Sequence, residues 1–152
     1  MPMERLELLL GIATWAHWTP SKHQFLAWTQ ATLPEGLAPA ALSIRVVGNA
    51  GSLRLNAEYR GKPKPTNVLS FAGSGLLPNG HRMLGELVIC APVVAREARA
   101  QDKALEAHWA HMTVHGLLHL LGMDHVRPRE ATKMESKEVQ ILDRLGFSNP
   151  YV

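Results

Sequence analysis

The segment HGLLHLLGMDH, residues 115–125, contains three histidines at a spacing typical of a metal site. His115 and His119 are four residues apart, so on a helix they lie one turn apart on the same face and can bind one ion. Gly122 can adopt the left-handed conformation that ends a helix, which lets the chain bring His125 back as a third ligand. Three neutral imidazoles suit zinc or another divalent transition metal and leave a coordination position for water. We therefore predict a helix with a metal site at its end.

The residue after the first histidine limits the chemistry of this site. Zinc peptidases with this spacing carry a glutamate there as general base, whereas this chain has Gly116. A metal held by three histidines lowers the pKa of its bound water to about 7, so hydrolysis does not require a separate strong base. The alternative is a set of structural histidines or a structural metal. A structural zinc usually has four protein ligands, and only three are in register here.

Composition is consistent with one globular domain over residues 1–152. The 46% share of hydrophobic residues in 152 is ordinary for a folded protein of this size. The single cysteine, Cys90, excludes an intrachain disulfide and fits a reducing compartment, so we expect a cytoplasmic location. No apolar run reaches the 18 residues needed to span a bilayer, and we expect no membrane partner.

Hydrophobic periodicity predicts strands and helices along the whole chain. The expected helix at 105–121 is apolar nearly all round, which predicts a central, buried position. In the expected helix at 50–59, Leu53, Leu55 and Tyr59 are the candidate buried positions. The other expected elements are strands at 6–13, 42–47, 66–71 and 84–90 and helices at 20–33, 92–101 and 128–145.

Four segments in this order resemble the YbeY family of bacterial endoribonucleases: LNAEYRGK at 55–62, PTNVLSF at 65–71, GELVIC at 85–90 and the histidine segment. The resemblance covers nearly the whole chain. It implies an α+β fold, in which a small mixed sheet packs with helices. Together with the elements expected above, this predicts a small mixed four-stranded sheet packed with about five helices, with the metal site at the end of a central buried helix.

The resemblance also implies an activity, that of a zinc-dependent, single-strand-specific endoribonuclease in ribosomal RNA maturation and ribosome quality control. It makes His115, His119 and His125 the metal ligands and Arg60 the residue that faces the substrate phosphate. The implied partners are single-stranded ribosomal RNA and the small ribosomal subunit or its assembly factors. Other hydrolases, such as a peptidase or small-molecule amidase, and a ribosome-binding factor with a structural metal are the rival hypotheses.

The basic run Arg60, Lys62 and Lys64 fits a phosphodiester substrate better than a peptide. An arginine fork binds two phosphate oxygens, while lysines act as diffuse anchors along a backbone. We expect metal-bound water to attack the phosphodiester while Arg60 stabilises the phosphate charge. From charge alone, a solvated surface turn is the alternative reading of this run.

Several other polar residues are candidates for smaller roles. Asn67 and Ser70 are predicted to line the substrate groove. Asp124 can hold a ligand histidine through its second ring nitrogen or stabilise the turn after Gly122. His108 and His111 share the stripe of the first two histidines, and we interpret them as packing or substrate-groove residues rather than ligands.

The chain departs from the usual pattern of the family at three positions. Pro63 stands where an aspartate is common, Ala72 where a proline is common, and Glu86 where an aspartate is frequent. None of the three is a predicted ligand. Pro63 is expected to stiffen the loop after Arg60.

Overall fold

The computed structural model describes residues 6–14, 16–37, 39–123 and 127–152. Within this part, five helices and four strands follow one another close to the predicted ranges. The strands are β1 (Leu6–Ile12), β2 (Ala40–Val47), β3 (Val68–Ala72) and β4 (Arg82–Cys90), and the helices are α1 (Lys22–Thr32), α2 (Asn49–Arg60), α3 (Ala91–Ala100), α4 (Leu105–Leu120) and α5 (Pro128–Arg144).

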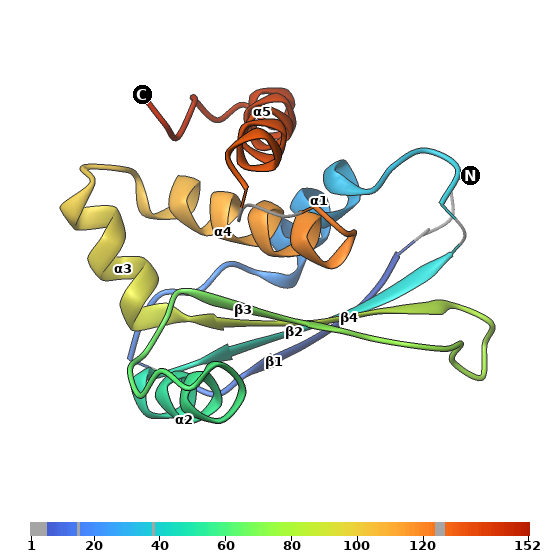
Figure 1. Ribbon diagram of the computed structural model, residues 1–152, viewed down its shortest axis with the longest axis horizontal. Helices are drawn as coiled ribbons and strands as arrows, with labels where there is room; N and C mark the ends of the chain where they lie inside the picture. The colour runs from blue at the N-terminus through green and yellow to red at the C-terminus, as the bar shows by residue number, and fades with distance from the viewer. Residues whose placement is uncertain (1–5, 15, 38, 124–126) are drawn as a thin grey trace.

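The four strands form one mixed sheet in the order β1-β2-β4-β3. β1 and β4 each run parallel to β2, while β3 pairs antiparallel with β4 and forms an edge of the sheet. Figure 1 shows α1 and α4 on one face, α5 lying over them, and α2 on the opposite face. The predicted α+β fold is confirmed.

Alternating strand residues build a core on each face of the sheet. Leu42 and Ile44 of β2 are fully buried, as is Trp109 of α4, and they belong to the larger core beneath α1, α4 and α5. Leu69 and Val88 point to the other face and join a smaller core that includes Leu55 of α2. Because successive strand residues face opposite ways, this pattern fixes the register of the sheet. The predicted central, buried position of α4 is confirmed.

A glycine lets α4 cross the sheet closely beside β3. A Cβ on Gly116 would lie 3.1 Å from side-chain atoms of both Leu87 and Val68. The hydroxyl of Ser70 donates a hydrogen bond of 3.0 Å to the Gly116 carbonyl, which ties the helix to the strand. This crossing places the histidines on either side of Gly116 next to the sheet edge.

The buried side of α2 is polar, and the prediction of Leu53 and Tyr59 as buried residues is wrong. Leu53 is 39% exposed and Tyr59 is 60% exposed, whereas Ser52 and Asn56 are buried. The side-chain amide of Asn56 donates a hydrogen bond of 2.8 Å to the Lys64 carbonyl, which fixes the turn that follows the helix. Apolar periodicity misses Ser52 and Asn56 because these two side chains bind a loop backbone, while Leu55 of the same helix packs against the smaller core. No described helix is long and apolar enough to cross a membrane.

Candidate metal and phosphate site

A cleft of about 690 Å³ lies along the open edge of β3. Tyr59 and Arg60, at the end of α2, line one side, and His115 and His119 of α4 line the other. Residues 66–71 lie between them. The two helices pack on opposite faces of the sheet, so the edge strand separates the predicted phosphate-binding residue from the predicted ligands.

Helix ends and turns position Arg60. It is the last residue of α2, and Gly61, with φ of 71°, ends the helix in the left-handed conformation that favours glycine. The Arg60 side chain is exposed at the rim of the cleft. A cation at a helix C-terminus is also favoured by the helix dipole. Arg60 is thus placed to contact a ligand without itself being part of the core.

His115 is held by a buried carboxylate on another helix. Its Nδ1 lies 2.6 Å from Oε2 of Glu138, whose side chain is completely buried in α5. Because a carboxylate accepts hydrogen bonds, His115 carries a proton on Nδ1, and in its neutral form the lone pair is therefore on Nε2. This is the tautomer that a metal ligand requires at Nε2, and carboxylates commonly hold ligand histidines in this way.

Glu138 accepts hydrogen bonds from three groups. His111 donates from Nε2 at 2.7 Å, His115 from Nδ1, and Tyr151 donates its hydroxyl. Burial alone would raise the pKa of Glu138, but these hydrogen bonds outweigh it and lower the pKa to about 2. Burial and the bond to Glu138 raise the pKa of Tyr151. The result is an ionised carboxylate that connects α4, α5 and the C-terminal residues.

The two described histidines fit a metal of the zinc type. His115 and His119 lie one turn apart on α4 and border the same cleft, and His115 carries the tautomer needed for coordination. His125 and Asp124 lie outside the described residues. Among residues that the structure does describe, no group of three or more His, Cys, Asp or Glu side chains is arranged to hold a metal. The metal site therefore stays a prediction.

Asn67 and Ser70 line the cleft, but their side chains also make internal hydrogen bonds. Asn67 donates to both oxygens of Glu97 at 3.2 Å and accepts from the Val68 amide at 2.6 Å. Ser70 bonds to Gly116 as described above. Lys62 and Lys64 are exposed in the turn after Arg60 and are not among the described residues that line the cleft.

The other two helix histidines are buried and do not line the cleft. His108 is 2% exposed and bonds through Nε2 to Glu97 at 2.9 Å, and His111 bonds to Glu138. Burial raises the pKa of Glu97, but the hydrogen bonds from His108 and Asn67 outweigh it, so that the pKa is lowered overall. Of the two alternatives for these histidines, the structure favours packing over a place in the groove.

Sequence reasoning missed Glu138, Tyr151 and Asn56. Glu138 carries a detectable signal, because it lies between Met134 and Ile141 on the buried stripe of α5, where a carboxylate requires a partner. Tyr151 has no such signal, since it lies beyond the last helix. Glu86, one of the three positions at which the chain departs from the usual family pattern, accepts hydrogen bonds from Ser43 at 3.1 Å and from Arg45 at 3.0 Å. It is not among the described residues that line the cleft.

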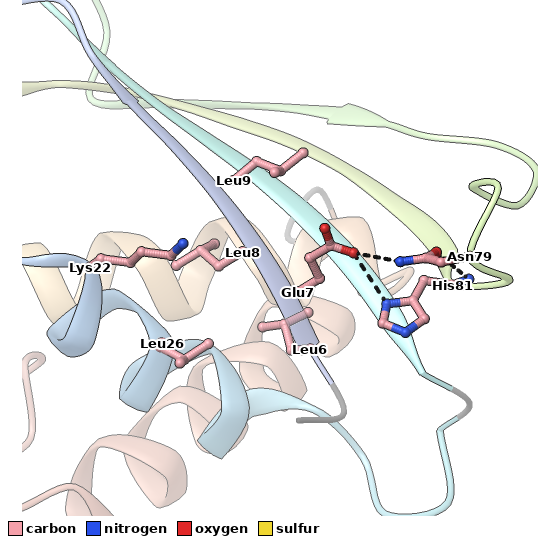
Figure 2. A pocket seen from close by; sticks show the side chains of 8 residues that line it. All are labelled: Leu6, Glu7, Leu8, Leu9, Lys22, Leu26, Asn79 and His81. Carbon is pink, nitrogen blue, oxygen red and sulfur yellow. Dashed lines mark hydrogen bonds and ion pairs between the residues drawn. The ribbon is translucent and has the colours of Figure 1, made fainter. Parts of the chain in front are cut away.

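A second cavity, of about 450 Å³, lies at the outer side of β1 (Figure 2). Glu7 of β1 accepts a hydrogen bond from Asn79 at 2.9 Å and lies 3.4 Å from His81. Leucines and Lys22 complete its lining. Neither Arg60 nor the histidines of α4 border this cavity, so it is separate from the candidate site.

Comparisons with known proteins agree with the fold and identify the family. The solution structure of TM1509 from Thermotoga maritima is similar in fold, with a TM-score of 0.55 and 21% sequence identity, covering 93% of this chain and 91% of that chain. The family profile described as Endoribonuclease YbeY matches residues 15–146. This match includes every strand and helix except β1, and the whole of the cleft. The chain belongs to the YbeY endoribonuclease family.

Proposed function

We propose that the protein is a zinc-dependent endoribonuclease that cuts single-stranded RNA during ribosomal RNA maturation and ribosome quality control. Family membership supports an endoribonuclease function in ribosomal RNA processing. The single structural observation that carries the proposal is the cleft along β3, bordered by Arg60 on one side and by His115 and His119 on the other.

The metal would be held by His115, His119 and His125. When bound, zinc lowers the pKa of a coordinated water to about 7 and so supplies a nucleophile at neutral pH. Glu138 keeps the His115 proton on Nδ1 and holds the imidazole in one orientation. Outer-shell carboxylates of this kind also raise the basicity of the ligand.

Arg60 donates hydrogen bonds to phosphate oxygens as charge develops on them. Its planar guanidinium offers a two-pronged donor, and it is exposed at the rim of the cleft. Lys62 and Lys64 attract the neighbouring phosphates from the turn. No aspartate or glutamate is found among the described residues that line the cleft, which favours an anionic substrate.

Residues 1–152 act as one domain, and the partners are unpaired ribosomal RNA and the small ribosomal subunit or its assembly factors. The buried thiol of Cys90 makes no disulfide and suits a reducing compartment such as the cytoplasm.

The test is cleavage of labelled RNA by protein whose zinc content has been measured. Wild type is compared with His119→Ala, on an unpaired oligonucleotide and on the matched duplex at equal salt. We expect zinc-loaded wild type to cut the unpaired strand and spare the duplex, and His119→Ala to cut neither. Equal cleavage by the zinc-free variant would contradict the proposal, and cleavage of casein in place of RNA would favour the peptidase hypothesis.

A further inference from the structure

Tyr59 is an aromatic side chain exposed to solvent inside the substrate cleft. It is 60% exposed, although a large aromatic residue on a helix usually packs into a core. It borders the same cleft as Arg60, the next residue along the chain, and as His115 and His119. The exposed ring of Tyr59 is therefore part of the candidate site.

The ring of Tyr59 is held in place by a second aromatic residue. Its centroid lies 5.0 Å from that of Phe71, with an angle of 68° between the planes. Phe71 is half-buried at the end of β3 and belongs to the smaller core around Leu69. An edge-to-face contact fixes the orientation of the exposed ring while leaving much of its surface open.

The neighbours of Tyr59 point to the chemistry of its ligand. Arg60 supplies a phosphate-binding group one residue away, and the described lining contains no carboxylate. The open edge of β3 borders the same cleft. In the antiparallel pairing of β3 with β4, the backbone groups of Leu69 and Phe71 bond to β4, so the backbone N–H and C=O of Ser70 point away from β4. A planar, uncharged group attached to a phosphate fits a flat ring, a nearby cation and open backbone donors and acceptors.

We propose that Tyr59 is a nucleobase-binding subsite, on which one base of the RNA strand stacks next to the phosphate that Arg60 contacts. This inference rests on the proposed function. In a duplex both faces of a base are covered by its neighbours, whereas an unpaired base can turn one face to an aromatic ring. The subsite thus supplies a physical reason for a preference for single strands.

The experiment measures binding of fluorescent unpaired RNA to the full chain after its metal has been removed with a chelator, so that cleavage does not interfere. Tyr59→Leu removes the ring, and Tyr59→Phe is the matched control that keeps it. Because stacking of a base on an aromatic residue commonly contributes about 1–3 kcal/mol, the leucine variant should bind roughly five- to 150-fold more weakly. The phenylalanine variant should bind within about twofold of wild type, and the melting temperatures of both variants should lie within a few degrees of the wild-type value.

Single abasic substitutions in the RNA locate the base. At one position the abasic RNA should bind wild type and Tyr59→Leu equally, while at other positions the difference between the proteins should persist. Equal RNA binding by Tyr59→Leu and Tyr59→Phe would overturn the subsite. So would a leucine defect that persists at every abasic position.

The failure of this proposal is distinct from the failure of the proposed function. If wild type cuts unpaired RNA and Tyr59→Leu binds it normally, the subsite is wrong and the endoribonuclease function stands. If wild type neither binds nor cuts RNA but binds an extended peptide along β3, both proposals are overturned.

Discussion

Replacing Glu138 by glutamine tests how the protein prepares His115 for metal binding. Glu138 offers two acceptor oxygens to three donors, from His111, His115 and Tyr151. A glutamine has nearly the same shape but only one acceptor oxygen and an NH₂ group that donates. If the NH₂ group faces His115, it donates to Nδ1 and moves the histidine proton to Nε2, where it blocks coordination. If the NH₂ group faces His111 and Tyr151, it meets the two groups that donate hydrogen bonds to Glu138 in the wild type, and three donors then face one another without an acceptor.

Both orientations lower metal affinity while preserving side-chain volume, because the first blocks Nε2 of His115 and the second replaces the carboxylate, which raises the basicity of the ligand, by a neutral amide. Loss of an outer-shell partner typically costs 10- to 100-fold in metal affinity, which is about 1.4–2.7 kcal/mol. The assay is competition for zinc with a chromophoric chelator at neutral pH, performed on protein shown by circular dichroism to be folded. Glu135→Gln is the matched control, since Glu135 is exposed on the same helix. A Glu138→Gln protein that binds zinc as tightly as wild type and the control would refute the reasoning.

Three further predictions concern the ligand histidines, Gly116 and the charge of Glu138. His119→Ala and His125→Ala should each release the metal, and full occupancy in both variants by metal analysis would remove these histidines as ligands. Gly116→Glu should lower the melting temperature without creating a peptidase, because even a Cβ lies 3.1 Å from a Leu87 methyl group; a stable variant that cleaves casein would contradict this. The pKa of Glu138 is lowered to about 2, so its carboxylate stabilises the fold above its ordinary pKa of 4.5 and loses this contribution as the pH falls toward 2. Urea unfolding of metal-free protein should therefore show the difference in stability between wild type and Glu138→Gln shrinking from pH 5 to pH 3, and a constant difference would count against it.

The order and type of the elements could be predicted from sequence because each has a local signal. The alternation in β2 and the apolar run of α4 are both decided by burial in one large core. The two described ligand candidates were also predictable, since a four-residue spacing on a helix sets their common face. The side chains that support them were not. Glu138 and His111 meet across two helices, and Tyr151 reaches the same carboxylate from the C-terminal residues, so no sequence spacing relates them.

The surface of α2 shows the opposite error. Apolar spacing favoured burial of Leu53 and Tyr59, yet the helix uses Ser52 and Asn56 to bind the turn beyond Arg60. Polar contacts to a loop backbone leave no periodic apolar pattern, so they could not be separated from solvent exposure by sequence alone. The same motif that carries the family resemblance therefore contains residues with two different tasks, one in holding the turn and one in facing the cleft.

The central claim is that Arg60 and the histidine site act on one phosphate across the cleft. The most direct measurement is single-turnover cleavage of an unpaired RNA by zinc-quantified wild type, Arg60→Ala and Arg60→Lys. Loss of a donor that acts on transition-state charge commonly costs about 2.7–4 kcal/mol, so Arg60→Ala should keep its zinc and melting temperature while cutting roughly a hundred- to thousandfold more slowly. Arg60→Lys should recover little, because it lacks the two-pronged geometry. Cleavage by Arg60→Ala at the wild-type rate, or loss of zinc from that variant, would contradict the account.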